Sequence, residues 1–418
     1  MEDRDLYARI LGLVDPWEVR DVKLDLKGGE VRVTVAPKLH TTFACPECGK
    51  VCPGYDTRQR SWRHLDTCQF KTILVADVAR VECEQHGVKQ VRVPWAEPGS
   101  GFTALMEAFV IGWLRALASI KTVAEQLRLS WDEVDGIMGR AVARGLMRRK
   151  RIKLTHIGVD ETSFRRRHEY VTIVTDLKGT RVVHVADDRK RESLDLFFRS
   201  LTPEELDAIE VIAMDMWGPY IISASNHLLE PHRKIAFDKF HVARHLGEAV
   251  DRVRSREHRA LLSQGDGSLK RTRYLWLWNP DNLDADQTAR LNALHEMNLK
   301  TGRAWALKET AMCIWRLVQR GRATLEWRAW IRKAMWSRLE PVKKAARMIR
   351  DHLYGILNAM ASRTTNAGSE SVNAKVQRVK RNACGFRNRE RFKNAIMFHL
   401  GGLDLYPAGA ISATHTTS

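Results

Sequence analysis

The sequence predicts an α/β protein with a mixed sheet, preceded by a cysteine-rich unit and a pair of short helices, and interrupted by an all-helical insertion. Three observations predict this architecture. Five of the seven cysteines fall in the first ninety residues, strand-like runs lie between residues 157 and 238, and residues 242–361 carry only helical signals. At roughly 100–200 residues per domain, 418 residues suffice for two to four domains, each with its own core.

The charge balance of the chain is strongly positive. There are 69 Lys and Arg against 50 Asp and Glu, a net charge of +19. Such an excess is expected on a protein that binds a polyanion, first of all nucleic acid. A membrane surface is the second choice, but no run approaches the roughly 18 consecutive apolar residues of a spanning helix. The start, Met-Glu-Asp-Arg-Asp, does not resemble a signal peptide.

The cysteines form two paired turns, Cys45-Pro46-Glu47-Cys48-Gly49 and Cys83-Glu84-Gln85-His86-Gly87. Each pair puts two ligands on one side of a tight turn, and the following Gly lets the backbone fold back. We therefore expect a structural Zn²⁺ ion, whose predicted ligands are Cys45, Cys48, Cys83 and His86. Cys52 and Cys68 are alternatives for one ligand, and a set of buried reduced thiols is the alternative to a metal site. An odd number of cysteines clustered at one end argues against a disulfide framework.

Residues 120–138 are typical of a helix-turn-helix. Ile120–Leu127 reads as a short helix, Arg128-Leu129-Ser130 as a turn, and a second helix begins at Trp131 with Ser130 as N-cap and Glu133 at the capping-box position. A helical hairpin within a core is the alternative. The basic run 144–153 that follows is better suited to DNA phosphates than to a core. The residues expected to contact phosphates here are Arg148, Arg149, Lys150 and Arg151.

From residue 157 the spacing of the apolar residues changes from that of helices to that of strands. We expect a strand at 157–161, a hairpin of 170–175 and 181–186, a helix at 191–201, a polar break at 202–205, a strand at 211–214, a helix from Pro219 to about His227, and a strand at 234–237. The predicted order is a three-stranded meander, helix, strand, helix, strand. In the helical insertion 242–361 we expect the tryptophans to form the core.

A further helix follows the insertion. Val372, Val376 and Val379 mark its buried stripe, and Glu370 lies on it with Asn366 and Asn373 close to one face. The helix and its continuation are rich in basic residues. Those expected to contact DNA are Lys375, Arg378, Lys380 and Arg381. The tail after Tyr406 is rich in Ala, Gly, Ser and Thr and is expected to be disordered.

Three carboxylates are expected to converge. Asp160 ends or nearly ends the first strand, Asp215 follows the fourth strand, and Glu370 lies on the later helix. In such a sheet the first and fourth strands are neighbours, which brings the two aspartates together below the glutamate. Their mutual repulsion is relieved by a pair of divalent cations, and hard oxygen ligands suit two Mg²⁺ or Mn²⁺ ions. Asp238 is the main rival ligand, whereas Glu161 is expected to point to the opposite face of its strand.

The order of these motifs is specific. After the paired turns and the helix-turn-helix come Gly158-Val159-Asp160-Glu161, Met214-Asp215-Met216-Trp217, Phe237-Asp238-Lys239-Phe240-His241 and Asn366-x-x-x-Glu370-x-x-Asn373, followed by Lys-Arg-Asn-Ala-Cys-Gly-Phe at 380–386. From about Cys45 to Leu400 the chain resembles the ISL3 family of bacterial insertion-sequence transposases. One departure is His86, where the family commonly has a fourth cysteine.

The resemblance implies a ribonuclease-H-like fold with an Asp-Asp-Glu triad. It implies that Asp160, Asp215 and Glu370 bind the catalytic metals, with Asp238, Asn366 and Asn373 as candidate supporting residues. It also implies that the zinc unit and the helix-turn-helix bind terminal inverted repeats, and that the helical insertion helps to shape the synaptic complex. The expected segments are a zinc-binding domain (1–98), a helix-turn-helix with basic linker (99–153), the catalytic domain in two parts (154–241 and 362–405), the helical insertion (242–361) and the tail (406–418).

We therefore expect a DNA transposase that hydrolyses phosphodiester bonds at element ends and joins the 3′-hydroxyl ends to target DNA. Two alternatives are a metal-dependent nuclease without strand transfer and a zinc-containing helix-turn-helix regulator without catalysis. The expected partner is double-stranded DNA. A homodimer is expected because two ends must be brought together. The expected location is the bacterial cytoplasm, at the nucleoid when the protein is bound to DNA.

Overall fold

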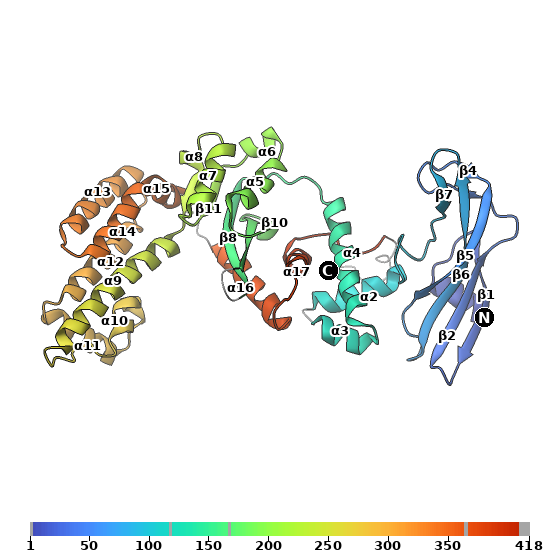
Figure 1. Ribbon diagram of the computed structural model, residues 1–418, viewed down its shortest axis with the longest axis horizontal. Helices are drawn as coiled ribbons and strands as arrows, with labels where there is room; N and C mark the ends of the chain where they lie inside the picture. Colours follow the sequence, from blue (N-terminus) through green and yellow to red (C-terminus); the bar gives the residue numbers. More distant parts are fainter. Residues whose placement is uncertain (1–2, 117–118, 166–168, 363–366, 409–418) are drawn as a thin grey trace. The chain divides into compact units, whose positions relative to one another are not determined.

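The computed structural model describes residues 3–116, 119–165, 169–362 and 367–408, without the side chains of residues 367, 369 and 370. The chain forms two compact units, which are described separately (Figure 1). The first comprises Met1–Lys150, Arg381–Gly385 and Leu403–Ser418, and the second Arg151–Lys380 and Phe386–Gly402. Most of the tail predicted to be disordered, from residue 409 on, lies outside the described residues.

The first unit begins with a β-sheet. Its strands, in the order β1-β2-β6-β5 with β7 paired to β6, are β1 (Trp17–Asp25), β2 (Glu30–Pro37), β6 (Lys71–Cys83), β5 (Gly54–Arg63) and β7 (Gly87–Gln90). The two-stranded ribbon β3 (Phe43–Ala44) and β4 (Val51–Cys52) lies beside it, and α1 (Asp3–Ile10) precedes it. The alternation predicted for the second strand is present, because Val31, Val33 and Val35 are buried. These side chains pack with Trp62 and Leu74 into one core.

Three helices complete the first unit: α2 (Ala104–Arg115), α3 (Ile120–Leu127) and α4 (Trp131–Arg148). The predicted helix-turn-helix is confirmed in α3 and α4. Arg128 adopts a left-handed conformation with φ of 53° in the turn, and Ser130 and Glu133 form the predicted capping box. The side chain of Ser130 accepts from the Glu133 amide, and the Glu133 carboxylate accepts from the Ser130 amide at 2.6 Å.

The second unit contains a mixed sheet in the order β10-β9-β8-β11-β12. Its strands are β8 (His156–Arg165), β9 (Glu169–Asp176), β10 (Arg181–Asp187), β11 (Val211–Met214) and β12 (Ile235–Phe237). The meander is antiparallel, and β11 lies parallel to both β8 and β12. The predicted order of elements is therefore confirmed, and the first and fourth strands are neighbours, as in a ribonuclease-H-like fold.

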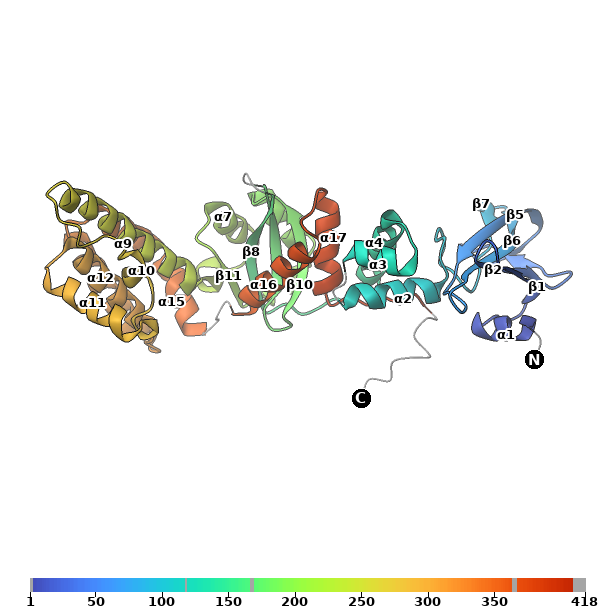
Figure 2. The same ribbon diagram turned by 90° about the horizontal axis from the view of Figure 1, so that it is seen from below.

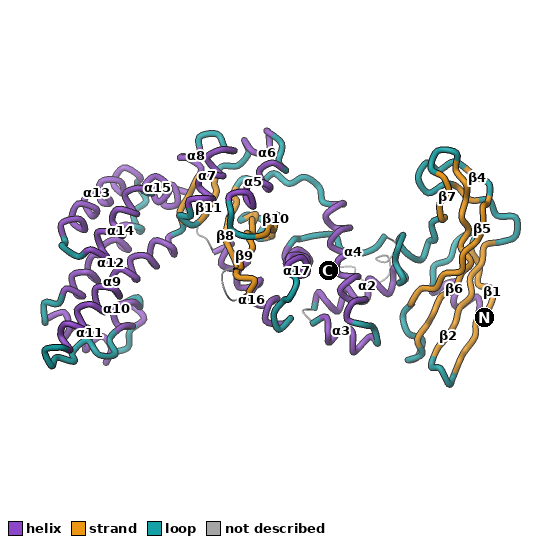
Figure 3. Tube along the Cα trace, in the orientation of Figure 1, coloured by secondary structure: helices purple, strands orange, loops and turns teal. Residues whose placement is uncertain are grey.

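The helices between the strands are α5 (Arg191–Arg199), α6 (Pro203–Asp207), α7 (Gly218–His227) and α8 (Pro231–Lys234). The prediction of a polar break at residues 202–205 is wrong. Thr202 is the N-cap of α6, Pro203 occupies its first turn, and Glu205 closes a capping box. Figures 2 and 3 show the strands of this sheet beside helices α7, α16 (Ala367–Asn382) and α17 (Arg389–Leu400).

The insertion is all-helical, as predicted. It consists of α9 (Lys239–Leu262), α10 (Arg273–Leu277), a 3₁₀ turn (Pro280–Asn282), α11 (Ala285–Glu296), α12 (Lys300–Ile314), α13 (Arg320–Trp336), α14 (Glu340–Asp351) and α15 (Leu353–Ser362). Trp276, Trp327 and Trp330 are core residues. The prediction that the tryptophans of the insertion form the core is wrong for Trp278 and Trp336, which are 46% and 86% exposed.

Helix α15 returns the chain to the edge strand of the sheet. The Asn358 amide donates to the carbonyl of Ile235 in β12 at 2.7 Å. A Cβ atom at Gly355 would lie 2.4 Å from the Phe237 ring, so only glycine permits this approach. In α16, Val372, Val376 and Val379 are buried, which confirms the predicted stripe. Among the described residues, no helix is long and apolar enough to cross a membrane.

Candidate functional site

Asp160 lies within β8, and Asp215 directly follows the adjacent parallel strand β11. The expectation that Asp160 ends or nearly ends its strand is wrong, because pairing with β9 continues to Arg165. In β8 and β11, Ile157 pairs with Ile212 and Gly158 with Ala213. Continuing this register by two residues brings Asp215 level with Asp160, on strands that are about 4.8 Å apart. Both aspartates line one cavity of about 500 Å³. The sheet topology therefore places two carboxylates side by side at the carboxyl end of β11.

This acidic cavity is enclosed by residues from the sheet, α7 and α9. It is lined by Val159, Asp160, Glu161, Tyr170, Arg189, Asp215, Met216, Trp217, Tyr220, His241, Arg244 and His245. The cavity thus combines carboxylates with imidazole and guanidinium groups. Such a lining is suited to a negatively charged substrate that binds together with cations.

The Asp160 carboxylate is held by two donors. Its Oδ1 accepts from the Glu161 amide at 2.7 Å, and its Oδ2 accepts from the Asn373 side-chain amide of α16 at 2.5 Å. Burial raises the pKa of the Asp160 carboxyl above its usual range, and Asp215 adds to this, whereas the two hydrogen bonds oppose it. The charged form of Asp160 is therefore costly here, and a nearby cation stabilises it.

The Asp215 carboxylate faces two basic side chains of α9. Its Oδ1 accepts from the Met216 amide at 2.7 Å. Its Oδ2 lies 3.4 Å from Nδ1 of His241 and 3.4 Å from the guanidinium of Arg244, both on α9. The first helix of the insertion thus supplies the groups that surround this aspartate.

Glu161 also lines this cavity. It pairs with Thr172, whose hydroxyl meets that of Tyr220 in α7, whereas Asp160 meets Asn373 of α16, so the two carboxylates leave β8 on opposite faces, as expected. The Oε1 of Glu161 is 3.2 Å from the Arg189 guanidinium. Burial raises the pKa of the Glu161 carboxyl, Arg189 opposes this shift, and the two aspartates add to it. The cavity therefore holds three described carboxylates.

Arg189 forms one wall of the cavity. Its guanidinium lies 4.7 Å from the Tyr170 ring centroid and 4.6 Å from that of Trp217. The indole Nε1 of Trp217 donates to the Arg189 carbonyl at 3.0 Å, which fixes the ring. No sequence pattern marks Arg189, because it follows β10 in a loop and meets its partners only through the tertiary fold.

Helix α16 lies along β8. A Cβ atom at Gly368 would be 3.3 Å from the Leu177 side chain, Asn373 reaches Asp160, and Gln377 donates to Thr162 at 2.9 Å. The Glu370 position falls in the helix between Gly368 and Asn373. The Glu370 side chain and the whole of Asn366 lie outside the described residues.

Asp238 caps the first helix of the insertion. It is the N-cap of α9, where its Oδ1 accepts from the Phe240 amide at 3.1 Å. It is not among the residues that line the acidic cavity. Capping therefore accounts for the presence of an Asp at this position.

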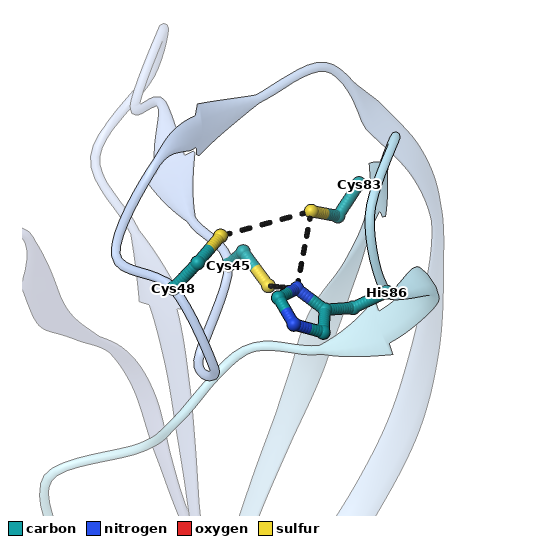
Figure 4. A group of neighbouring side chains, drawn as sticks. All are labelled: Cys45, Cys48, Cys83 and His86. Atoms are coloured by element: carbon teal, nitrogen blue, oxygen red, sulfur yellow. Dashed lines mark hydrogen bonds between the residues drawn. The ribbon is translucent and has the colours of Figure 1, made fainter.

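The four predicted zinc ligands of the first unit converge (Figure 4). Their ligand atoms all lie within 4.8 Å of one another. The Cys48 and Cys83 sulfurs are 3.8 Å apart, and Nδ1 of His86 is 3.7 Å from the Cys45 sulfur and 3.5 Å from that of Cys83. Zinc bonds of about 2.3 Å to sulfur and about 2.0 Å to nitrogen give tetrahedral edges of about 3.5–3.8 Å. The residues therefore fit a structural zinc ion.

The turns also favour thiolates. The backbone amide of Gln85 points at the Cys83 sulfur and, with that of His86, lowers the pKa of this thiol to about 7. The Cys48 amide likewise lowers the pKa of the Cys45 thiol. Cys52 lies outside the group of four, and its thiol donates to the Lys50 carbonyl at 3.2 Å. Cys68 also lies outside this group of four.

Several of the basic residues expected on DNA have partners within the protein. Arg148 lies 3.2 Å from Asp404, and Arg151 lies 3.2 Å from Glu205. Lys380 donates to the Ser163 carbonyl at 2.7 Å. Arg149 is half-buried and also has a partner. The side chains of the remaining candidates are exposed: Lys150, Lys375, Arg378 and Arg381.

One part of the basic run contradicts its predicted character. Arg144 is buried and forms ion pairs with Glu97 at 2.5 Å and Glu107 at 2.8 Å. The interpretation of the run as unsuited to a core is therefore wrong at this residue. Burial of an arginine is tolerated here because both carboxylates are supplied by the fold.

Comparison with known families gives three matches that follow the chain in order. Residues 157–396 match the ISL3 family model of Asp-Asp-Glu domains, described as "Transposase". Residues 91–142 match the "Helix-turn-helix domain of transposase family ISL3". Residues 41–86 match the "zinc-finger of transposase IS204/IS1001/IS1096/IS1165". These matches coincide with the acidic cavity, the α3–α4 pair and the Cys/His cluster.

Two curated relatives are similar over most of their length. The "Transposase for insertion sequence element IS1557" of Mycobacterium tuberculosis is 28% identical, covering 96% of this chain and 96% of the relative. The "Transposase for insertion sequence element IS1001" of Bordetella parapertussis is 27% identical, covering 83% of this chain and 86% of the relative.

Proposed function

We propose, from the premise that this chain belongs to the ISL3 family of transposases, that it cuts and joins DNA at the acidic cavity of its second unit. The observation that carries this proposal is that Asp160, within β8, lies level with Asp215, which directly follows the parallel strand β11, and that both line one cavity. Helix α16, which bears Glu370, contacts Asp160 through Asn373.

The proposed metal ligands are Asp160, Asp215 and Glu370, and the proposed ions are two Mg²⁺ or Mn²⁺. Oxygen donors suit these hard cations. Burial is the main cause of the raised pKa of the Asp160 carboxyl, and a bound cation would offset the cost of keeping this buried group charged. When bound, two such ions activate the attacking hydroxyl and stabilise the leaving oxygen in displacement at phosphorus.

The residues around the carboxylates have positioning roles in this proposal. Asn373 holds Oδ2 of Asp160, and the Glu161 amide holds Oδ1, so that the carboxylate keeps one orientation. His241 and Arg244 do the same for Asp215. Arg244 is part-exposed and is positioned to attract a phosphodiester to the cavity.

We further propose that the reaction has two steps. Water attacks the phosphorus at the element end, the P–O bond to the 3′ oxygen breaks, and a 3′-hydroxyl is released. That hydroxyl then attacks a phosphodiester of target DNA, forming one new P–O bond as another breaks. The zinc unit and the helix-turn-helix bind the terminal inverted repeats, and a homodimer holds two ends together.

For the phosphate contacts we propose the four exposed basic residues, Lys150, Lys375, Arg378 and Arg381. Their side chains are accessible, whereas Arg148, Arg151 and Lys380 already bond within the protein. Structural zinc, held by the Cys/His cluster, is proposed to maintain the shape of the N-terminal unit.

The test uses Asp160→Asn and Asp215→Asn with DNA that carries the element ends. Both substitutions preserve size and remove one charge, and we expect loss of cleavage and strand transfer with retained DNA binding. Asp286→Asn, at an exposed position of α11, is the matched control and is expected to retain both activities. Cleavage without joining by the parent protein would identify a nuclease. Binding without metal-dependent cleavage by the parent would identify a regulator.

A further inference from the structure

We propose that the outer face of α13 in the helical insertion binds the sugar-phosphate backbone of duplex DNA. We call this surface the α13 face. It consists of Arg322, Leu325, Arg328, Arg332, Lys333 and Trp336. The proposal requires only a DNA partner and does not depend on the chemistry proposed for the acidic cavity.

The face follows from the way α13 packs. The helix buries Ala323, Trp327, Trp330, Ile331 and Ala334. The residues of the α13 face lie on the other side of the helix, where all six are exposed. Arg322, Leu325, Arg328, Arg332 and Trp336 recur at spacings of three and four, and Lys333 lies next to Arg332. Arg322 and Lys333 are eleven residues apart, about 16 Å along the helix. Since one DNA strand carries a phosphate every ~3.4 Å of its axis, this length spans several phosphates.

The positive charge of the α13 face exceeds the negative charge beside it, which comes from the exposed Glu326 one turn after Arg322. Within α13, Glu326 is the one acidic residue against five basic ones. Among the described residues, none forms an ion pair with Arg322, Arg328, Arg332 or Lys333. The neighbouring helix α14 differs, because Lys343 and Arg347 both pair with Glu340, and Arg350 pairs with Asp351.

Trp336 adds an apolar anchor to the cationic surface. It is 86% exposed, whereas Trp327 and Trp330 of the same helix are buried. Exposed Trp beside Arg is typical of a surface that becomes covered on binding. A second copy of the chain meeting the same face would bring cations against cations, so a polyanion is the better occupant.

The experiment compares two full-length triple variants that lose the same charge. One is Arg322→Gln, Arg332→Gln and Lys333→Gln on α13, and the control is Lys343→Gln, Arg347→Gln and Arg350→Gln on α14. DNA affinity is measured over a series of salt concentrations, with an end-bearing duplex and an unrelated duplex. The slope of log affinity against log salt is negative. We expect it to become shallower by about 2 to 3 in the α13 variant, on both duplexes, because up to three phosphate contacts are lost. The control is expected to change the slope by less than about 1.

Trp336→Ala separates the apolar contact from the charge. It is expected to weaken binding several-fold without changing the salt slope, whereas Trp278→Ala, also at an exposed tryptophan, is expected to bind as the parent does. Equal slopes for the two triple variants would overturn the proposal. It would also be overturned if the α13 variant kept its slope and instead lost self-association in sedimentation, which would make the face an interface between copies.

These binding measurements can be repeated in the Asp160→Asn protein. The same slopes are expected there, because the substitution lies in the cavity and not on α13. A failure of the proposed cleavage chemistry therefore leaves this result unchanged, and a failure of the α13 proposal leaves the cleavage assays unchanged.

Discussion

Asn373 is the residue that connects α16 to the carboxylate pair. Its amide donates to Asp160 at 2.5 Å, while Gln377, one turn later, donates to Thr162 further along the same strand. The two side chains make equivalent helix-to-strand contacts, but only Asn373 touches a carboxylate of the cavity. Comparing substitutions of Asn373 and Gln377 therefore distinguishes the orienting of Asp160 from the packing of α16 on the sheet.

Asn373→Ala is expected to lower the rate of DNA end cleavage by roughly tenfold, because a lost hydrogen bond to a charged group costs about 1.5 kcal/mol or more. Single-turnover cleavage with saturating DNA measures this effect, and DNA affinity is expected to stay unchanged. Gln377→Ala is the control and is expected to cut at the parent rate. Equal losses in the two variants would assign Asn373 a packing role only.

His64 makes the first unit sensitive to acid. It is buried, its Nδ1 lies 2.8 Å from the Thr103 hydroxyl, and burial lowers its pKa to about 4. In the unfolded chain His64 binds a proton below about pH 6.5, whereas in the folded chain it does so only below about pH 4. The free energy of unfolding therefore falls as the pH is lowered from about 6.5 to about 4. The loss is expected to reach about 3 kcal/mol.

Urea unfolding of the first unit at pH 7 and pH 4.5 measures the effect. His64→Gln removes the titrating group, and we expect a smaller loss of stability between the two pH values in that variant. A loss as large as in the parent protein would show that other groups cause the acid sensitivity.

At the residue scale, chemistry that depends on residue type and local spacing could be predicted. The paired turns predicted the converging Cys45, Cys48, Cys83 and His86. Arg189, His241 and Arg244 could not be assigned, because their partners are brought to them by tertiary packing. The same reason explains why Arg144 was misinterpreted, since Glu97 and Glu107 lie 47 and 37 residues away.

Among the elements, α15 depends on a glycine at its contact with β12. Gly355→Ala places a Cβ atom 2.4 Å from the Phe237 ring, and overpacking of this kind is expected to cost about 1–3 kcal/mol. Gly321→Ala is the control, because nothing lies within 4 Å of its Cβ position in α13. There the change is expected to stabilise the helix by up to about 1 kcal/mol. Thermal unfolding measures both effects: the midpoint temperature is expected to fall in Gly355→Ala and to rise in Gly321→Ala.

The zinc unit is expected to depend on its metal for folding. Cys45→Ala removes a ligand, and we expect loss of bound zinc with protease sensitivity confined to residues near 41–86. Metal analysis and limited proteolysis measure these two outcomes. Cys68→Ala is the control, because Cys68 is exposed and outside the cluster. Zinc content equal to that of the parent in Cys45→Ala would contradict the ligand assignment.

The elements with strong local signals could be predicted. The α3–α4 pair was recognisable because Ser130 and Glu133 specify a helix start, and α16 because its buried valines have helical spacing. Helix α6 was missed although Thr202, Pro203 and Glu205 carry the same kind of signal. Its five residues are too few for an apolar periodicity to be visible.

On the scale of the whole molecule, sheet topology brings distant carboxylates together. A meander followed by helix and strand makes β8 and β11 neighbours, which is why Asp160 and Asp215 could be paired from the order of elements alone. The exposure of Trp278 and Trp336 could not be predicted, because composition does not distinguish a core tryptophan from one on a binding surface. Both kinds are present within the helical insertion.

The central claim is that Asp160, Asp215 and Glu370 bind the same divalent ions. The most direct test loads the protein with Fe²⁺ in place of Mg²⁺ and adds peroxide, so that radicals formed at the metal cut the polypeptide nearby. The account predicts cuts close to residues 160, 215 and 370 together, suppressed by excess Mg²⁺ and absent in Asp160→Asn. Cuts near 160 and 215 without any near 370, or cuts unaffected by Mg²⁺, would contradict it.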